Sequence, residues 1–269
     1  MLATAVLSLA PVAVLAQERL VADVPDLPDE HAAIARRGER LSFPSPAEYF
    51  RVLARATNPR WRTWYRELAA VPPTDRSKVS AGLGFLIAEA HLAAMARDEQ
   101  RLHNVCLELG AHMKILGFKD ALAPVIANVE ARVLASNWNA VHMDLEILAA
   151  EAVEELLRQR DEDSARLATL GLWMRVMHVG SGVVAGGEVK DLSLAAGGEG
   201  LPQRLAEVAA GISEKAKETE PLALMMRQGE KVARIWSREK FEAGRVFTVE
   251  EVKDTHDRCA TIVSHLSAG

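Results

Sequence analysis

The stretch "DEQRLHNVCLELGAHMKILG", residues 98–117, has the spacing that decides the fold. Its apolar side chains recur at steps of three and four residues, at Leu102, Cys106, Leu109, Met113 and Leu116. This spacing places them on one face of an α-helix, whereas a half-buried strand would alternate apolar and polar residues. Gly117 follows the last apolar position, as is typical of a helix C-terminus. The stretch therefore predicts an amphipathic helix with one face in a core.

The same periodicity predicts further helices on both sides of this stretch. They fall within residues 47–56, 60–70, 78–96, 120–134, 138–160, 164–178, 201–218, 221–241 and 248–266. Ser45 with Glu48, and Thr248 with Glu251, form capping-box signatures, and Asn58 before Pro59 predicts another helix start. No strand-like alternation stands out. Because short connections favour antiparallel neighbours, we expect an all-α, multi-helix antiparallel bundle of about eight to ten helices.

One segment departs from the helical rhythm: "GSGVVAGGEVKDLSLAAGGEG", residues 180–200, holds seven of the seventeen glycines. We expect a Gly-rich crossover loop here within a single helical domain, residues 45–269. A division into residues 45–179 and 201–269 is the alternative, but the second part would struggle to bury a core alone. A phosphate-binding loop is disfavoured, because such loops follow a strand and open a helix, whereas a helix precedes these glycines.

The N-terminus reads as a targeting segment followed by an arm. Residues 2–16 are apolar, and Gln17, Glu18 and Arg19 follow abruptly. This shape predicts a signal peptide over residues 1–16 and hence an exported protein, periplasmic or extracellular. An uncleaved anchor is the alternative, although the run is shorter than the ~20 residues of a spanning helix. Residues 17–44 then form a Pro-containing arm, and no membrane span is expected after cleavage.

Composition narrows the classes of function. The net charge is −5 and basic and acidic residues are mixed, which argues against a nucleic-acid surface. No Ser-His-Asp elbow, Cys-x-x-Cys pair or His-Glu-x-x-His motif occurs. We therefore expect a non-catalytic binding or scaffolding protein with a protein partner and no cofactor.

The two cysteines admit three interpretations. Cys106 and Cys259 each follow a histidine by three residues, His103 and His256. In an exported protein, two cysteines suggest a Cys106–Cys259 disulfide. Two buried free thiols are the second possibility. The third is a structural zinc site, or a metal-dependent enzyme, built from His103, Cys106, His256 and Cys259, because residues three apart share a helix face.

Two apolar clusters are candidates for binding. In "NPRWRTWYREL", residues 58–68, Arg60, Trp61 and Trp64 could stack on a ligand and hold its negative charge. The same tryptophans also fall at helical spacing, which favours core packing. An exposed groove containing Met225, Met226 and Trp236 is the second candidate surface for a partner, although core packing is the role that the sequence favours for each.

Two histidine–acid pairs one turn apart, His142 with Glu146 and Glu108 with His112, are predicted to lie on solvated helix faces. A di-iron site would need Glu-x-x-His on two helices, and that tetrad does not occur in the chain.

The central third carries a resemblance to known proteins. "DRSKVSAGLGFLIAEAHLAAMARDEQRLHNVCLELGAHMKILG" and "RQRDEDSARLATLGLWMR", within about residues 72–177, resemble a set of exported helical bacterial proteins. The shared motifs are Leu, Gly and Ala spacings, which specify packing. The resemblance implies an exported, all-helical protein and assigns no activity, ligand or residue role.

Overall fold

The computed structural model describes residues 43–267, with the exception of residues 68–72, 188 and 199. The predicted signal peptide and nearly all of the predicted arm lie outside the described residues. The described residues belong to one compact unit, Arg40–Gly269. Within them, nine helices of at least seven residues form a packed bundle without strands, which confirms the all-α prediction.

The elements follow one another in a simple order along the chain. They are α2 (Pro46–Thr57), η1 (Trp61–Trp64), α3 (Arg76–Met95), α4 (Glu99–Leu116), α5 (Lys119–Leu134), α6 (Trp138–Arg158), α7 (Glu162–Gly186), η2 (Leu192–Ala196), α8 (Leu201–Ala210), α9 (Glu214–Lys217), α10 (Glu220–Ile235), α11 (Arg238–Glu242) and α12 (Val249–Ser267). The η elements are 3₁₀ helices. The predicted helices over residues 201–218 and 221–241 are each divided in two.

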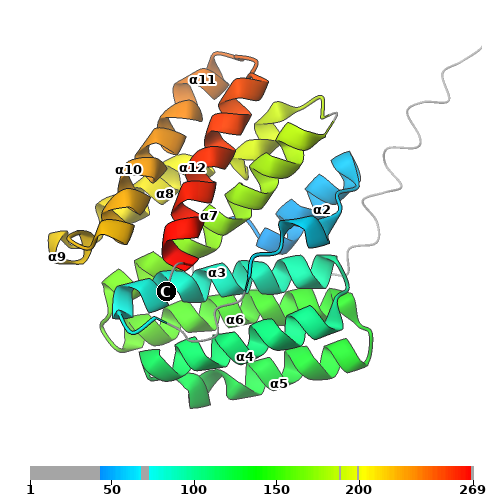
Figure 1. Cartoon of the computed structure of the whole chain (residues 1–269), viewed down its shortest axis with the longest axis vertical. Helices are drawn as coiled ribbons and strands as arrows, with labels where there is room; N and C mark the ends of the chain where they lie inside the picture. The colour runs from blue at the N-terminus through cyan, green and yellow to red at the C-terminus, as the bar shows by residue number, and fades with distance from the viewer. Residues whose placement is uncertain (1–42, 68–72, 188, 199, 268–269) are drawn as a thin grey trace, which may run out of the picture. The chain divides into compact units, whose positions relative to one another are not determined.

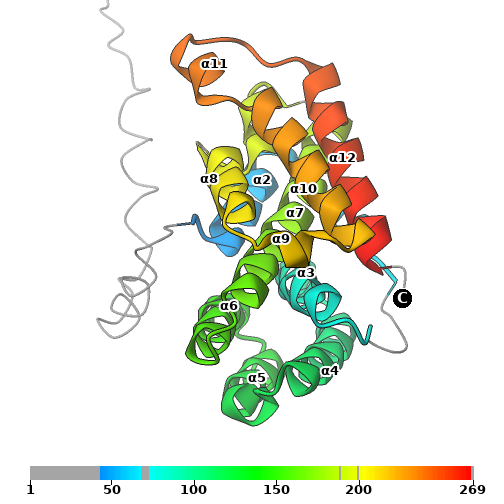
Figure 2. The ribbon, with the colours of Figure 1, turned by 90° about the vertical axis from the view of Figure 1, so that its left-hand side faces the viewer.

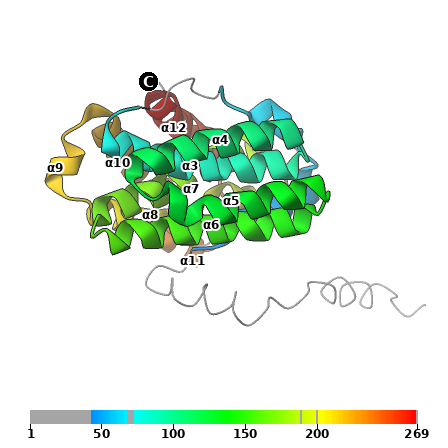
Figure 3. The same ribbon diagram turned by 90° about the horizontal axis from the view of Figure 1, so that it is seen from below.

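Helices α3 to α6 lie side by side, as Figures 1 and 3 show. Connections of three residues or fewer join the successive helices from α3 to α7, so each helix doubles back on the one before it. Helix α7 packs against α3 and α6 and also against α8 and α12. Figure 2 shows this second group, with α10 and α12 next to each other, above helices α3 to α6, which are seen end-on. Helix α7 is therefore the central helix that belongs to both groups.

Glycines allow α3 and α7 to cross closely. A Cβ atom at Gly84 would lie 1.9 Å from the carbonyl oxygen of Ala168, and one at Gly171 would lie 2.0 Å from that of Ala81. By length and composition both helices could cross a bilayer, yet 83 % and 89 % of their most apolar windows are buried in the bundle. Their composition is thus explained by their central position in the core.

The N-cap predicted at Ser45 and the capping box predicted at Thr248 are confirmed, whereas the helix start predicted at Asn58 is wrong, because Asn58 is the left-handed C-cap of α2. The Ser45 hydroxyl accepts a hydrogen bond from the Glu48 amide at the start of α2. Thr248 and Glu251 bond reciprocally before α12, at 3.1 and 3.2 Å. Gly117 ends α4 in the left-handed conformation, with φ of 88°.

The Gly-rich loop is shorter than predicted, because α7 continues through Gly186. The prediction of a loop was therefore wrong for residues 180–186. These glycines make room for neighbouring rings: a Cβ at Gly180 would lie 1.8 Å from the Tyr49 hydroxyl, and one at Gly182 would lie 2.3 Å from the Trp64 indole. The left-handed glycines come later, at Gly197 and Gly200, beside η2.

The helix predicted over residues 60–70 is not formed in its described part, residues 60–67. Within that part only Trp61–Trp64 is helical, as a short 3₁₀ helix, and Tyr65 is extended, with ψ of 139°. The carbonyl groups of Trp64 and Arg66 accept hydrogen bonds from arginine side chains of the bundle instead of from backbone amides of a helix. Tertiary contacts therefore override the local preference in this segment.

Candidate functional site

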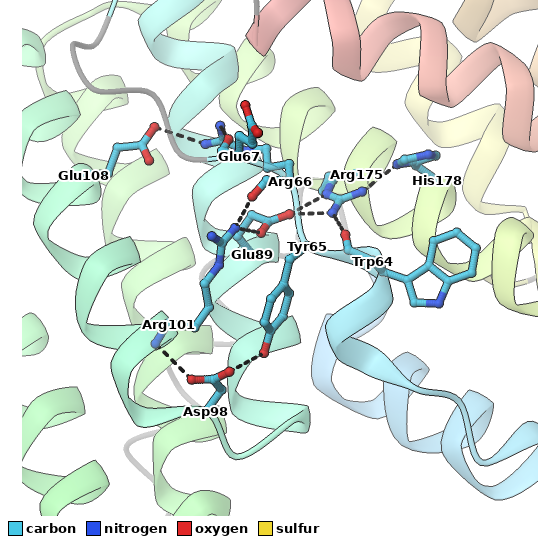
Figure 4. A network of polar contacts seen from close by, with 10 residues as sticks. All are labelled: Trp64, Tyr65, Arg66, Glu67, Glu89, Asp98, Arg101, Glu108, Arg175 and His178. Carbon is cyan, nitrogen blue, oxygen red and sulfur yellow. Dashed lines mark hydrogen bonds and ion pairs between the residues drawn. The ribbon is translucent and has the colours of Figure 1, made fainter.

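A buried carboxylate lies at the centre of the main polar network. Glu89 on α3 is fully buried. Its Oε1 accepts from Arg175 of α7, at 2.7 Å from Nε and 2.5 Å from Nη2, and its Oε2 accepts from Nη2 of Arg101 on α4 at 2.7 Å. Figure 4 shows the two guanidinium groups reaching Glu89 from two sides. A charge buried this deeply is tolerated only with such complete pairing.

The same two arginines fix the backbone of the segment that follows η1. Nη2 of Arg175 donates to the carbonyl of Trp64, and Nη2 of Arg101 donates to the carbonyl of Arg66 at 2.5 Å. Both carbonyls belong to residues outside regular α-helix, so they have no helical amide partner. The Trp64–Arg66 backbone is thus attached to α4 and α7 through charge-assisted hydrogen bonds.

Side chains of this segment add further contacts to α4. Nη2 of Arg66 lies 3.1 Å from Oε1 of Glu108, and both side chains are largely buried. The Arg101 guanidinium lies over the Tyr65 ring, 4.8 Å from its centroid. Nε of Arg62 pairs with the Asp98 carboxylate at 3.3 Å. The segment is therefore held through backbone, charge and ring contacts together.

Beyond Arg175 the network ends in a cluster of three rings. Nη1 of Arg175 lies 2.5 Å from Nδ1 of His178, and because arginine can only donate, His178 carries its proton on Nε2. Nδ1 of His256 donates to the His178 carbonyl at 3.0 Å. The two imidazoles stack at 4.7 Å, and the Trp64 ring is nearly perpendicular to both. Burial, then Arg175 and His256, lower the pKa of His178 to about 2.

This arrangement favours a role in positioning the Trp64–Arg66 backbone over a role in proton transfer. Both oxygens of Glu89 accept from guanidinium groups, and Nε and Nη2 of Arg175 are engaged by Glu89 and by a carbonyl. General acid–base catalysis needs a titratable group within reach of a substrate proton. The charges of this network are instead directed at one another and at the Trp64–Arg66 backbone.

The predicted disulfide is wrong, because Cys106 and Cys259 are both free and buried. Cys106 on α4 lies near Glu130 of α5, while Cys259 on α12 lies near Tyr49 of α2. Burial raises the pKa of each thiol to about 12. Of the three interpretations, the structure matches two buried thiols.

The four residues of the predicted zinc site do not come together. His103 is exposed and pairs with Glu130 at 3.1 Å, whereas His256 stacks on His178. Among residues 43–267, apart from the segments left undescribed, no group of three or more His, Cys, Asp and Glu side chains is arranged to hold a metal ion.

The binding candidates of the sequence are divided between surface and core. Arg60 is exposed, but Trp61 is buried and packs edge-on against Phe50 at 5.5 Å. Trp64 is half-buried beside the two histidines. Core packing, which the helical spacing of the two tryptophans favours, is therefore found for Trp61 and only in part for Trp64.

The second predicted surface is mostly core. Met225 is buried, and Trp236 is fully buried, with its Nε1 donating to Thr255 Oγ1 at 2.9 Å. The core packing that the sequence favours is therefore found for these two residues, and they form no exposed groove. Met226 is half-buried and lines a small apolar hollow between α7, α8 and α10 together with Met174 and Leu205.

The histidine–acid pairs predicted to face solvent also lie inward. Glu108, His112 and His142 are buried, and Glu146 hydrogen-bonds the start of α2. Those predictions were wrong because the partners of these residues come from distant segments.

The central residues Glu89, Arg101 and Arg175 were missed for the same reason. A signal was present: Glu89 and Arg175 are single charges inside long apolar runs, which predicts burial with a partner.

No protein-family model matches this chain, and searches of curated proteins and of solved structures find no similar protein.

Proposed function

We propose that this chain is a non-catalytic binding or scaffolding protein, and that residues 60–66 are its docking segment for an acidic polypeptide. The observation that supports this most is the attachment of the segment's backbone at the carbonyls of Trp64 and Arg66. A surface segment that is fixed before binding loses little conformational entropy when a partner docks. Non-helical segments on a rigid scaffold commonly carry binding residues.

The charge of the region indicates the kind of partner. Residues 49–66 contain five arginines and no acidic residue, although the whole chain has a net charge of −5. Arg55 and Arg60 are exposed, and the Arg62 side chain is 69 % exposed despite its pairing with Asp98. A local cluster of positive charge attracts and orients an acidic partner.

A charge-reversal pair tests this proposal. Binding of a fluorescent oligoglutamate peptide is measured by anisotropy for wild type, for R60E/R62E and for R234E/R238E. Arg234 and Arg238 are 78 % exposed and lie on α10 and α11, so the second pair changes net charge equally at another place. We expect R60E/R62E to weaken binding at least ~10-fold, as loss of a complementary charge pair does. Equal weakening by both pairs would show that only net charge matters.

Two further probes separate the partner classes. Anionic phosphatidylglycerol vesicles and single-stranded DNA are titrated beside the peptide. Preference for either over oligoglutamate would refute an acidic polypeptide as the partner. Circular dichroism of each variant verifies that the helical fold is retained.

Export is part of the same proposal and is supported by the apolar run over residues 2–16. The full chain is expressed in a bacterial host, and the N-terminus of the protein recovered from each fraction is sequenced. We expect a periplasmic species that begins at Gln17. An intact N-terminus in the cytoplasmic fraction alone would contradict export.

A further inference from the structure

A second polar cluster lies apart from the docking segment and joins three helices. His91 on α3 is fully buried, and His142 on α6 is 5 % exposed. Their Nδ1 atoms are 3.4 Å apart, and their rings are nearly parallel, with an interplanar angle of 9°. Two facing nitrogens at this distance form a hydrogen bond only if one of them carries a proton. The geometry therefore fits two neutral imidazoles and disfavours a doubly protonated pair.

Glu146, one helical turn after His142, connects this pair to α2. Its Oε1 lies 3.9 Å from Nε2 of His91, which makes no hydrogen bond with the described residues. The same oxygen accepts from the Ser45 hydroxyl at 2.5 Å and from the Ala47 amide at 3.2 Å. Ser45 is the N-cap of α2. The carboxylate thus binds the first turn of α2 and faces the histidine pair at once.

The charges around the cluster come from two helices. Arg51 of α2 lies near His91, His142 and Glu146 and acts on all three. Burial, then Arg51, lower the pKa of His91 to about 3, and burial with His91 and Arg51 does the same for His142. Burial raises the pKa of Glu146, while Ser45, Ala47 and Arg51 oppose that rise.

We propose that His91, His142 and Glu146 form an acid-sensitive lock on α2. The lock is closed at neutral pH, and acid favours the open state because it protonates the two histidines once they are exposed. The closed lock holds two neutral imidazoles beneath α2. When α2 detaches, water reaches both rings and each accepts a proton. Acid therefore stabilises the open state through the two histidines, whereas Glu146, whose pKa burial raises in the closed state, acts in the opposite direction.

The size of the effect follows from proton linkage. In the open state each imidazole has an ordinary pKa of about 6.5, so lowering the pH from 7.5 to 5.5 favours opening about tenfold per histidine. Two histidines that are exposed together give about a hundredfold. Detachment of α2 would also remove Phe50 from Trp61, at the start of the docking segment.

Hydrogen exchange of the full chain at the two pH values tests the lock directly. After correction for intrinsic rates, we expect the opening constant of peptides from α2 to rise about a hundredfold at pH 5.5 and to stay larger at both pH values than that of peptides from the α3–α7 crossing, which exchange through global unfolding. The variant H91N/H142N, which cannot titrate, should lose this rise. The matched control H265N removes an exposed histidine of α12 and should keep it.

Two results would overturn the lock. One is the same pH dependence of α2 exchange in H91N/H142N as in wild type. The other is an equal opening constant in the α2 and the α3–α7 peptides, which would mean that α2 is exposed only by global unfolding. If the double variant does not fold, NMR titration of the histidine rings in wild type replaces it. Constant shifts of His91 and His142 down to about pH 5 support the lock, and midpoints near 6.5 refute it.

Discussion

Glu89 and Arg175, 86 residues apart in sequence, form a two-pronged ion pair in which both side chains are almost completely buried. The pair joins α3 to α7 close to where these helices cross, and through Arg175 it also holds the carbonyl of Trp64. One interaction therefore links the central helix contact to the surface segment that we propose as the docking element.

Replacing Arg175 with methionine is expected to destabilise the protein by about 3 kcal/mol, since the variant leaves part of the Glu89 charge unpaired in the core. Urea unfolding followed by circular dichroism measures this loss. Arg234→Met, which removes an exposed arginine, should change stability by less than about 0.5 kcal/mol.

A double-mutant cycle separates the energy of the Glu89–Arg175 ion pair from the effect of lost packing. Because Glu89→Gln removes the unpaired charge, E89Q/R175M should cost less than the two single changes added together. Additive costs would mean that the two side chains contribute independently.

Much of the fold could be predicted because its signals are local. The N-cap at Ser45, the capping box at Thr248 and the left-handed Gly117 each depend on residues within one turn. The apolar spacing that begins at Leu102 likewise depends only on the helix itself.

The network could not be predicted because its members meet only in the folded chain. Glu108 and His142 have the spacing of solvated residues, and only Arg66 and His91, from distant segments, explain their burial. Gly182 shows the same limit: glycine indicates either a turn or a close approach, and only the position of Trp64 decides between them.

Adding one methyl group at the helix crossing should be severely destabilising. In Gly171→Ala the new Cβ would lie 2.0 Å from the backbone oxygen of Ala81, so α3 and α7 would have to separate. We expect a loss of more than about 3 kcal/mol, as overpacking against backbone allows little relief. Thermal unfolding compares it with Gly186→Ala, in the same helix, where no atom lies within 4 Å of the added group. That control should gain up to about 1 kcal/mol, and equal effects at the two positions would contradict the close crossing.

Acid should weaken the fold through His178. Its pKa is about 2 in the folded chain, held down by burial and Arg175, and about 6.5 when unfolded. The unfolded state therefore binds the proton first, so this stability is complete above about pH 6.5 and falls continuously toward pH 2. Between pH 7 and pH 5 we expect a loss of about 1 to 2 kcal/mol from this histidine alone, measured by urea unfolding. His178→Asn should reduce the loss by that amount, whereas His103→Asn, at an exposed position, should leave it unchanged.

The two cysteines should be unreactive in the folded protein despite the oxidising compartment that we propose. Only a thiolate attacks a disulfide reagent, and burial raises the pKa of Cys106 and of Cys259 to about 12. A thiol-specific disulfide reagent at about pH 8 should therefore modify neither residue at a measurable rate, and both rapidly after unfolding in urea. Single Cys→Ser variants assign each modification to its residue. The intact mass of the untreated protein adds an independent check, because two free thiols keep two hydrogens that a disulfide would remove. A mass lower by two hydrogens would mean that the chain adopts a different packing of α4 and α12 in solution.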